Sequence, residues 1–558
     1  MNLTSMADSA NSILIVEQAR VNGLPLTYVL GSYAARVTFC SQQIRAFNLI
    51  WALFEQKIIS EGSKVCIVGG GLAGMTAAAA AKLKRCNVTI YESGDQLMSL
   101  QRRNPTRYVH PNICDWPKNG SEINKTKLPC LNWSAAKTEE VVEQIDQEWE
   151  LVKEGIDVQV RRNVRKIKEN DGKPRVTIND PFITEQFDCV ILATGFGIEQ
   201  SFGDVPLRAY WDNDNLHQTM KWAKLPKKIL VTGCGDGGLI DVLRLKLVDF
   251  KHAKFTVEFL ENASLKDLRE KLIKIEENAP ADPEKTAIYF IDQYKDLPID
   301  ETLMSNIKSK IRSDTKVTLN SSLSTPLNSV ASILNRFAIY LLIKLEELKY
   351  ISSKVTSVTR TAGGFDVVFS ENEPEVFDDV IVRHGPVPII QDLIPSTHVP
   401  IKSKKEDLLA GQLWPDDFYA QKIEDGLKQV LLSSPPYGEV ISIMGSNGRF
   451  VSSEGGGGPM YCNRQYSGSY ERFLVVDAGK GKFALENYGR YVTSQNGSSP
   501  IVCDRPILNV WEKFEWVCGP EGIGFKGNNS CFISSRNGEA MTCDIPVMKS
   551  CEWIFRSR

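Results

Sequence analysis

The sequence has no cysteine spacing that is typical of a zinc site or a disulfide framework. It holds thirteen cysteines in 558 residues, but no two of them are spaced C-x-x-C. Without a close pair of cysteines, thiol–disulfide exchange is not expected either. Five scattered histidines form no cluster of metal ligands, so no metal site is predicted. A G-x-S-x-G nucleophile elbow is also missing.

The sequence has little net charge and no long apolar run. Its formal net charge is −2, so no global field would recruit nucleic acid or an anionic membrane. No uncharged apolar run approaches the ~18 residues that a membrane span needs. The N-terminus lacks the basic start and apolar core of a signal peptide. Unpaired cysteines are typical of reduced, buried thiols, and we therefore predict a cytoplasmic protein.

Residues 1–60 are predicted to be a helical segment. In FCSQQIRAFNLIWALFEQ, apolar residues recur three or four positions apart, which is typical of one face of an amphipathic helix. A membrane-surface helix is the alternative, but its polar face is poor in lysine and arginine. We expect this helix to pack on the domain that follows.

Two stretches have the same design. KVCIVGGGLAGMTAAAA begins a unit at residues 61–225, and KILVTGCGDGGLIDVLR begins a second unit at residues 226–390. Each runs from an apolar strand through G-x-G-x-x-G into a helix. Each unit also continues into an antiparallel meander and a return strand, FDCVILATG in the first and FDDVIVRHG in the second. We expect KFTVEFLE to be the next strand of the second unit, and an internal duplication of α/β nucleotide-binding folds.

Residues 391–436 are predicted to be a connector, and residues 437–558 to be an all-β domain. The last 122 residues hold 17 of the 40 glycines. They repeat three times at intervals of 40 or 41, as Cys462, Cys503 and Cys543 show, and glutamates at 471, 512 and 552 keep the same rhythm. Three such units indicate a β-trefoil whose repeated apolar positions form a shared core.

The stretch GRYVTSQNG…VCDR…WEKFEW resembles fascin-type β-trefoils. The resemblance covers only this last fifth of the chain and implies a binding module. Its ligand, a protein or a glycan, is left open. The Q-x-W signature of ricin-type sugar-binding trefoils is missing, which weakens the glycan alternative. One trefoil offers one surface, so cross-linking of filaments is not expected.

The first loop has the residue types that a dinucleotide needs. Gly69 makes the tight turn, Gly71 lets a pyrophosphate approach the backbone, and Gly74 lets the helix pack closely on the strand. Glu92 follows at the end of the second strand, where a carboxylate can accept hydrogen bonds from a ribose diol. A Rossmann fold that has lost its ligand is the alternative.

FDCVILATGFG resembles the second FAD-side signature of flavoproteins that have two dinucleotide-binding domains. This superfamily includes disulfide reductases and flavin monooxygenases, and the resemblance covers residues 61 to about 390. It implies that the first loop and Glu92 hold FAD, that Thr194 and Gly195 line the dinucleotide, and that NAD(P)H binds the second unit. Among the nearby arginines 102, 103 and 107, Arg103 is our candidate for the phosphates, with a solvated basic loop as the alternative.

The second loop keeps the glycines Gly233, Gly235 and Gly238 but adds an acid, Asp236. A carboxylate repels a pyrophosphate unless it points away or caps the helix. Glu258 and Glu261 are candidate ribose partners, and the lack of a nearby arginine favours NADH over NADPH. Packing or substrate binding by this loop remains the alternative.

The second return strand ends in Arg383-His384, where the first ends in Ala-Thr-Gly. Ligands of such sheets lie outside the carboxyl ends of the strands. Arg383 could hold an anion, and His384 could transfer a proton near neutral pH, so both are candidate catalytic residues. The structural alternative is a packed, hydrogen-bonded histidine. His110, Asp115 and Trp116 are further candidates for residues that line the site.

The leading hypothesis is an FAD-dependent oxidoreductase, reduced by NAD(P)H, that passes electrons to oxygen or a small organic substrate, as a monooxygenase does. The trefoil would then serve as its binding module. The alternative is a protein without catalysis, which binds FAD or NAD as a sensor or scaffold and uses the trefoil for interactions.

Overall fold

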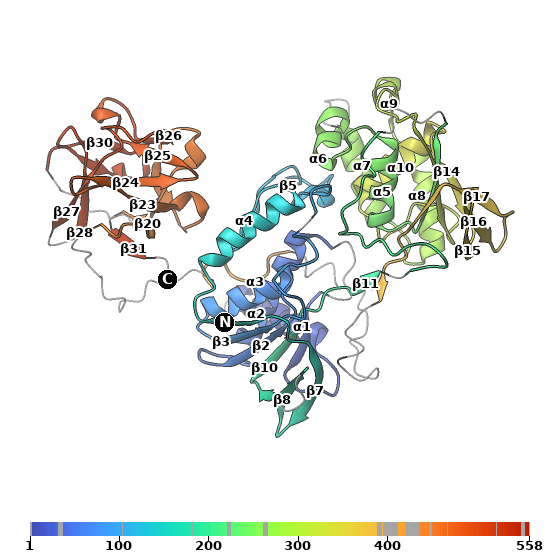
Figure 1. Ribbon diagram of the computed structural model, residues 1–558, viewed down its shortest axis with the longest axis horizontal. Coiled ribbons are helices and arrows are strands. Elements are labelled where there is room, and N and C mark those ends of the chain that lie inside the picture. The colour runs from blue at the N-terminus through green and yellow to red at the C-terminus, as the bar shows by residue number, and fades with distance from the viewer. Residues whose placement is uncertain are drawn as a thin grey trace. The chain divides into compact units, whose positions relative to one another are not determined.

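The computed structural model divides the chain into two compact units (Figure 1). One unit comprises residues 1–149 and 155–418, and the other comprises residues 150–154 and 419–558. The described residues are 3–31, 37–102, 104–179, 183–199, 201–219, 225–260, 266–387, 393, 411–419, 435–445, 449–465, 467–519, 522–547 and 553–556. Within these ranges, no helix is long and apolar enough to cross a membrane. The five-part division of the chain stays a prediction.

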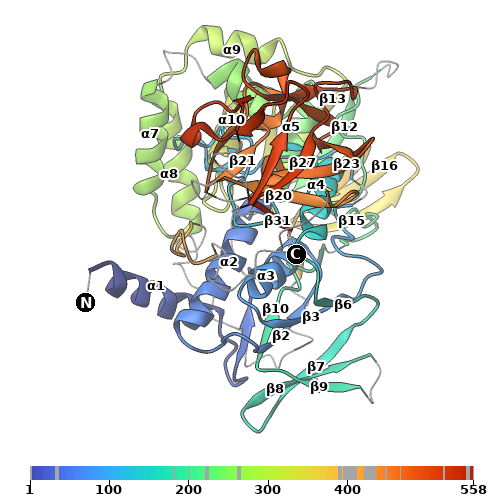
Figure 2. The ribbon, with the colours of Figure 1, turned by 90° about the vertical axis from the view of Figure 1, so that its left-hand side faces the viewer.

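The first lobe of the large unit is built on a parallel sheet with the strand order β1-β10-β2-β3-β6. Its strands are β1 (Thr27–Val29), β2 (Lys64–Val68), β3 (Asn87–Tyr91), β6 (Ile156–Gln159) and β10 (Cys189–Leu192). Its helices are α1 (Leu3–Ala19), α2 (Phe39–Glu55), α3 (Leu72–Leu83) and α4 (Thr138–Glu150). α3 packs on β2 and β3, and α2 packs on α3 (Figure 2). β2 and β10 are near-continuous apolar runs. This composition is typical of parallel strands that are buried on both faces of the sheet.

The helix predicted near the N-terminus is confirmed as α2, and most of it is buried. The structure adds a strand that the sequence analysis missed: β1 pairs in parallel with β10 and extends the sheet. With only three residues, β1 is too short to show a period in the sequence.

The two predicted meanders are confirmed. The first comprises β7 (Val164–Asn170), β8 (Lys173–Ile178) and β9 (Thr184–Gln186), and the second comprises β15 (Val355–Thr361), β16 (Gly364–Phe369) and β17 (Glu375–Phe377). Asp171 and Gly172 form the first turn, with φ of 51° and 76°. Two positive φ angles in a two-residue loop match the twist of the flanking strands.

The second lobe repeats the first. Its parallel sheet has the order β14-β13-β12-β18, with β12 (Lys227–Thr232), β13 (Thr315–Ser321), β14 (Lys349–Ser352) and β18 (Asp379–Val382). The corresponding strands of the first lobe run β6-β3-β2-β10, so the order is the same. The helices α5 (Asp236–Lys246) and α10 (Ile333–Lys344) pack together in its core. The predicted duplication is therefore present in the topology.

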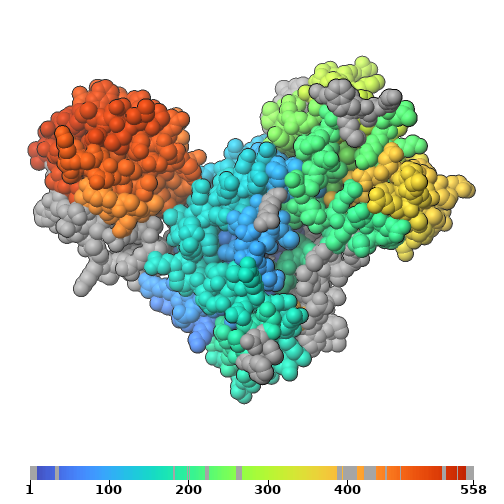
Figure 3. All heavy atoms as spheres, in the orientation of Figure 1, coloured from blue at the N-terminus to red at the C-terminus, as the bar shows by residue number. Residues whose placement is uncertain are grey.

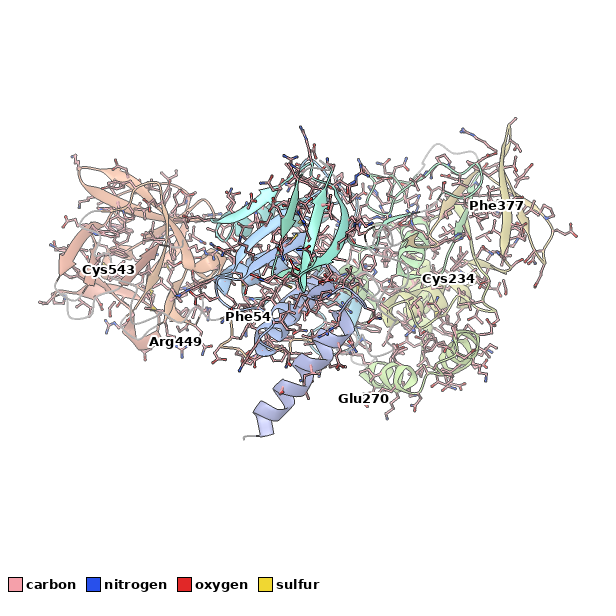
Figure 4. The ribbon with its side chains drawn as sticks, turned by 90° about the horizontal axis from the view of Figure 1, so that it is seen from below. Phe54, Cys234, Glu270, Phe377, Arg449 and Cys543 are labelled. Atoms are coloured by element: carbon pink, nitrogen blue, oxygen red, sulfur yellow. The ribbon has the colours of Figure 1, made fainter. Side chains whose placement is uncertain are left out.

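One predicted strand is wrong. Residues 254–261 were expected to be a strand next to β12, but α6 (His252–Phe255) and a π-helical turn, η2 (Thr256–Leu260), occupy this region. The alternation of apolar residues in FTVEFL suits a strand, yet Phe255 and Leu260 are buried in the helical core. An insert of three helices, α7 (Lys266–Glu277), α8 (Pro283–Lys295) and α9 (Glu301–Lys308), follows before β13. Figure 4 labels Glu270 on this insert, and Cys234 and Phe377 within the second lobe.

Short elements join the two lobes. β11 (Ile198–Glu199) pairs antiparallel with β19 (Pro386–Val387), so the segments that follow the two return strands run side by side. A second small ribbon pairs β4 (Tyr108–Val109) with β5 (Ala136–Lys137). It lies in residues 107–137, an excursion of the first lobe that also includes the 3-10 turn η1 (Ile113–Asp115). η1 packs against α10 of the second lobe.

The C-terminal unit consists of short antiparallel strands and forms a rounded body (Figure 3). Its strands are β20 (Val440–Met444), β21 (Phe450–Ser452), β22 (Tyr461–Arg464), β23 (Arg472–Gly479), β24 (Lys482–Asn487), β25 (Arg490–Thr493), β26 (Val502–Arg505), β27 (Glu515–Gly519), β28 (Gly522–Lys526), β29 (Phe532–Ser534), β30 (Thr542–Ile545) and β31 (Trp553–Arg556). The 3-10 turns η6 (Glu454–Gly456), η8 (Gln495–Gly497) and η9 (Arg536–Gly538) follow β21, β25 and β29, once in each repeat.

A closed ring of three backbone hydrogen bonds relates the repeats of this unit. The N–H of Met460 donates to Ile501, that of Ile501 donates to Met541, and that of Met541 returns to Met460, at 2.8, 2.8 and 2.9 Å. The three residues lie 41 and 40 positions apart and so hold corresponding places in the three repeats.

The repeated cysteines are buried in the core of the C-terminal unit, as predicted. Their thiols donate to the backbone carbonyls of Arg449, Arg490 and Cys531. Figure 4 labels Arg449 and Cys543. Glu471 and Glu512 each accept a hydrogen bond from the backbone N–H three residues earlier, whereas Glu552 lies outside the described residues.

Candidate functional site

The first loop has a geometry that only glycine permits at two positions. Gly69 has a φ of +110°, and a Cβ there would lie 2.4 Å from the carbonyl oxygen of Ala193. A Cβ on Gly74 would lie 2.0 Å from the oxygen of Gly69. The strand, the turn and helix α3 are therefore packed backbone to backbone, which fixes the helix start at the carboxyl edge of the sheet.

Gly71 leaves the start of α3 open. It is the N-cap residue of α3, with φ −72° and ψ 176°, and the helix start has no capping hydrogen bond from a side chain of this residue. Apart from Gly71 itself and its two chain neighbours, no described residue has an atom within 4 Å of the position that a Cβ would take. Free N–H groups and the positive end of the helix dipole make such a start suitable for a phosphate.

Glu92 lies beside this loop at the end of β3. Its carboxylate accepts hydrogen bonds from the backbone N–H groups of Gly70 and Gly94, both at 2.6 Å. Each carboxylate oxygen has a second lone pair. Glu92 can thus receive the hydroxyls of a ribose while it remains fixed to the loop.

Thr194 has an unfilled hydrogen-bonding position next to the loop. Its Oγ1 is buried, and no partner for it exists in the described part of the chain. Gly195 follows with a φ of +71° and open space at its Cβ position. Buried hydroxyls are normally hydrogen-bonded, so an orphan here fits a ligand that passes this turn. Together, the open helix start, Glu92 and Thr194 fit the dinucleotide part of FAD.

The second loop repeats this backbone geometry. Gly233 has a φ of +119° with a Cβ position 2.1 Å from the oxygen of Arg383, and a Cβ on Gly238 would lie 1.9 Å from the oxygen of Gly233. Gly235 caps α5 with φ −73° and ψ 173°, and its Cβ position is open among the described residues. The loop therefore also fits a pyrophosphate.

Asp236 directs its carboxylate to another helix. Its Oδ1 accepts hydrogen bonds from the backbone N–H of Ser332, at 2.8 Å, and from Nδ2 of Asn335, at 2.6 Å. Ser332 is the N-cap of α10, whose dipole favours a negative charge there. Of the two arrangements that the sequence left open, the structure shows the one in which Asp236 points away from the loop: its carboxylate caps α10 and makes no capping hydrogen bond to its own helix, α5.

The second lobe lacks an acid where the first has Glu92. The backbone N–H of Gly69 donates to Tyr91, and that of Gly233 donates to Asn320, both at 2.8 Å. The residue after Asn320, which corresponds to Glu92, is Ser321.

Glu258, one of the two acids named from the sequence, does not end a strand. Glu258 lies in the π-helical turn near Lys254 and Lys310, at 3.8 and 4.0 Å. Its prediction as a strand-end ribose partner is therefore wrong, and Glu261 lies outside the described residues.

Arg383 is held in a buried ion network. Its Nε donates to Asp241 at 2.8 Å, and its Nη1 donates to Glu199 at 2.8 Å. Asp241 is fully buried and also receives Nη1 of Arg107 at 2.9 Å. Burial would raise the pKa of the Asp241 carboxyl, but Arg107 and Arg383 outweigh it and hold the pKa below its usual value. The carboxylate therefore stays charged.

Arg107 brings the first lobe into this network. Besides Asp241, it contacts Asp214 at 3.3 Å and lies 3.6 Å from the ring centre of Tyr210. Arg244 also pairs with Asp214, at 2.6 Å. Three arginines thus face three carboxylates. Arg107 is engaged here and not at the first loop, Arg102 pairs with Asp146, and Arg103 lies outside the described residues.

His384 ends a chain of side-chain hydrogen bonds. Nδ2 of Asn320 donates to two backbone carbonyls, so its Oδ1 accepts from the hydroxyl of Thr232, at 2.8 Å. That hydroxyl then accepts from Nε2 of His384, also at 2.8 Å. The proton of the neutral imidazole is therefore on Nε2, which leaves Nδ1 as a proton acceptor. Burial of part of the ring lowers the pKa of His384 and favours this neutral form.

The segment of residues 110–116 packs against the second lobe. Ile113 and Trp116 belong to the same hydrophobic core as α5 and α10, and Trp116 stacks on Phe337 with ring centres 6.3 Å apart. Burial raises the pKa of the Cys114 thiol, with Asp236 and Asp115 adding to the effect, so little reactive thiolate forms.

His110 is buried with one ring nitrogen satisfied. Its Nδ1 accepts hydrogen bonds from the backbone N–H groups of Asn112 and Ile113, at 3.2 and 3.0 Å. Its Nε2 is buried without a partner among the described residues. Burial, together with the nearby His252, lowers the pKa of His110 to about 4. The neutral imidazole is therefore part of the folded state.

Comparisons with known proteins agree with the nucleotide-binding assignment. Residues 63–240 match the family model described as pyridine nucleotide-disulphide oxidoreductase, and this range includes both glycine loops. The match supports the predicted class, an FAD/NAD(P)-binding oxidoreductase with an α/β Rossmann-like fold. The predicted cofactors, FAD with NAD(P)H as a possible second, are those of this family, and that prediction is confirmed. No curated protein sequence matches the chain.

Several solved structures are similar to 58–62% of the chain. Bacillithiol disulfide reductase Bdr (YpdA) from Staphylococcus aureus is 14% identical over 60% of this chain and 79% of its own, with a TM-score of 0.33. Thioredoxin reductase from T. acidophilum is 14% identical over 60% and 80%, with a TM-score of 0.31. OTEMO in complex with FAD and NADP is 12% identical over 62% and 75%, with a TM-score of 0.32. The assignment rests on the family match.

We predict that Asp241→Asn destabilises the large unit strongly. The amide would remove the carboxylate that the buried Arg107 and Arg383 share and leave each with one other partner, Asp214 and Glu199, and breaking such a buried pair costs about 3–5 kcal/mol. Chemical denaturation measures the loss. As a control, Glu150→Gln removes an exposed pair with Lys153 and should cost less than about 1 kcal/mol. If both variants lost the same unfolding free energy, the proposed contribution of the buried network to stability would be contradicted.

We also predict that stability falls as the pH is lowered from 6.5 to 4, in part because of His110. The unfolded chain takes up this proton near pH 6.5, whereas the folded chain resists it until about pH 4. Protonation therefore favours unfolding by roughly 3 kcal/mol at the acid end. His110→Asn keeps an acceptor for the two N–H groups but does not titrate.

The measurement is the unfolding free energy of both proteins at several pH values. His110→Asn should lose less stability than the wild type over this window. His217→Asn, at an exposed histidine, is the control: partial burial and Arg244 also lower the pKa of His217, but less than the pKa of His110 is lowered, so its curve should lie closer to that of the wild type. Parallel curves for His110→Asn and wild type would show that His110 does not carry the effect.

Proposed function

We propose that this protein is an FAD-dependent oxidoreductase that NAD(P)H reduces and that passes electrons to oxygen or a small organic substrate. The open start of α3 at Gly71 carries the proposal. Glu92 and the orphan hydroxyl of Thr194 lie at the same edge of the sheet and suit the ribose and the dinucleotide chain. Bound FAD would supply the acceptance and release of electrons.

Thiol chemistry is not part of the proposal. Burial raises the pKa of Cys66, Cys114 and Cys189, so these thiols stay protonated at neutral pH. The eleven cysteines whose side chains the structure describes are free thiols, and no group of three metal-binding side chains occurs within the described ranges. Chemistry of the monooxygenase kind, in which oxygen accepts the electrons, suits this set of residues better than disulfide reduction.

The second loop, Gly233, Gly235 and Gly238, is the proposed site of the nicotinamide dinucleotide. His384, with Nδ1 free to accept a proton, is the proposed acid–base residue at the carboxyl edge of the second sheet. Arg383 is the weaker candidate, because Asp241 and Glu199 already occupy its guanidinium.

The C-terminal unit is proposed to be a β-trefoil that resembles the fascin type and binds a protein or a glycan. The closed ring through Met460, Ile501 and Met541 supports a pseudo-threefold axis, as a trefoil requires. The free thiols of Cys462, Cys503 and Cys543 agree with the predicted cytoplasmic location.

A single substitution tests the flavin site. Gly71 has backbone angles that alanine adopts easily, and its Cβ position is open, so Gly71→Ala should fold normally. The added methyl group fills the space where the pyrophosphate must approach the backbone. We expect at least a tenfold loss of FAD affinity, about 1.4 kcal/mol, in titrations followed by visible flavin absorbance.

Gly235→Ala is the matched control, because it makes the same change in the second loop and should leave FAD affinity unchanged. If wild-type protein stays colourless and fails to take up added FAD, the proposed function is wrong. Anaerobic addition of NADH separates an enzyme from a sensor: prompt bleaching of the flavin is expected for the oxidoreductase, and a stable oxidised spectrum for the sensor.

A further inference from the structure

The turn after β13 is where the ribose of a dinucleotide on the second loop would lie. Two contacts show that this turn corresponds to the one after β3. In the first lobe, the backbone N–H of Met98 donates to the oxygen of Gly70 at 2.9 Å. In the second, Nδ2 of Asn328 donates to the oxygen of Cys234 at 2.6 Å. Each turn thus closes on the second residue of its glycine loop.

The turn of the second lobe has no charge of its own. Residues 321–327 read SSLSTPL, so neither an acid for a ribose diol nor a base for a phosphate is present. Ser321, in the place of Glu92, shares its hydroxyl with the phenol oxygen of Tyr350 at 2.8 Å. A charged side chain that binds the ribose must therefore come from another segment.

Glu284 supplies a carboxylate to this turn from the helical insert. It lies in the first turn of α8, and both of its oxygens accept from the backbone N–H of Ser324, at 3.1 and 3.3 Å. Thr325 fixes the same turn to α8 by donating to the carbonyl of Ala287 at 2.9 Å. In the first lobe, Glu92 accepts in the same way from the backbone N–H of Gly94, three residues beyond the end of β3.

We propose that Glu284 replaces the missing strand-end acid and makes the second loop selective for NAD(H) over NADP(H). The inference rests on the proposed function, since it assumes that the second loop holds a nicotinamide dinucleotide. Glu284 is exposed, and its oxygens keep lone pairs that a ribose diol can use. The same carboxylate repels the charged 2′-phosphate of NADP(H), and the turn offers no arginine to offset the repulsion.

Equilibrium binding tests this proposal without catalysis. The full-length protein is titrated with NAD⁺ and with NADP⁺ by isothermal calorimetry, as wild type, Glu284→Gln and Glu284→Arg. Wild type should bind NAD⁺ about tenfold more tightly than NADP⁺, a difference typical of one well-placed charge. Glu284→Gln should bring the two affinities close together, and Glu284→Arg should favour NADP⁺.

Glu301→Gln is the matched control. Glu301 also lies in the first turn of an insert helix that follows an aspartate N-cap, since Asp300 caps α9 as Asp282 caps α8. This variant should keep the wild-type preference. Melting temperatures of all variants check that they fold, and Glu284 is exposed, so none should melt far below wild type.

Each other result has a distinct meaning. A wild type that prefers NADP⁺, or a preference that survives in both Glu284 variants, overturns the role of Glu284 and leaves the proposed oxidoreductase intact. Binding of neither dinucleotide overturns both this inference and the proposed use of the second loop, whereas FAD binding at the first loop is then tested separately by Gly71→Ala.

Discussion

The buried carboxylate of Asp241 is the constraint on which the rest of the large unit depends. It lies one turn into α5 and is fully removed from water, so it needs positive partners. These partners come from two distant segments: Arg107 from the excursion of the first lobe, and Arg383 from the end of the last strand of the second sheet. One side chain therefore fixes the second loop, the return strand and the first lobe with respect to one another. Arg383 can satisfy this need only while its guanidinium stays in place, which limits what else it can bind.

The two glycine loops share a backbone and differ in their side chains. Both loops keep the contacts that depend on backbone alone, with Cβ positions at Gly74 and Gly238 only 2.0 and 1.9 Å from a carbonyl oxygen. Differences are confined to side chains. Around the second loop, Asp236 stabilises the start of α10, and a serine follows the strand where the first lobe has Glu92. A loop whose own acids serve the fold must obtain a ribose-binding carboxylate elsewhere, and the helical insert is the segment that reaches it.

The features that could be predicted from the sequence are those that short-range patterns determine. Glycine spacing, meanders and return strands all follow from local turn chemistry and strand periodicity, and they were found in both lobes. The strand expected at residues 254–261 was wrong because this stretch forms α6 and a π-helical turn, which bury Phe255 and Leu260 in spite of the strand-like alternation. The role of Arg107 could not be read from the sequence, because its partner Asp241 is 134 residues away and nothing in either segment marks the pair. Arg383 and His384 follow β18 as expected, whereas Glu258 lies in a π-helical turn, and a place at a strand end did not reveal the partners of Arg383 or His384.

For His384, the position in the fold and the hydrogen-bond partners together determine which ring nitrogen can accept a proton. The strand end places the imidazole at the carboxyl edge of the second sheet, where ligands of such folds bind. Its protonation follows from Asn320, whose amide group donates to two carbonyls and so forces the direction of each bond along the chain to Nε2. A buried residue on β13, two strands away in the sheet from β18, thus decides that Nδ1, and not Nε2, can take up a proton. Hydrogen bonds within the sheet therefore determine which nitrogen of the exposed His384 ring carries the proton. In the same way, the ion pair with Asp241 limits which other groups the guanidinium of Arg383 can bind.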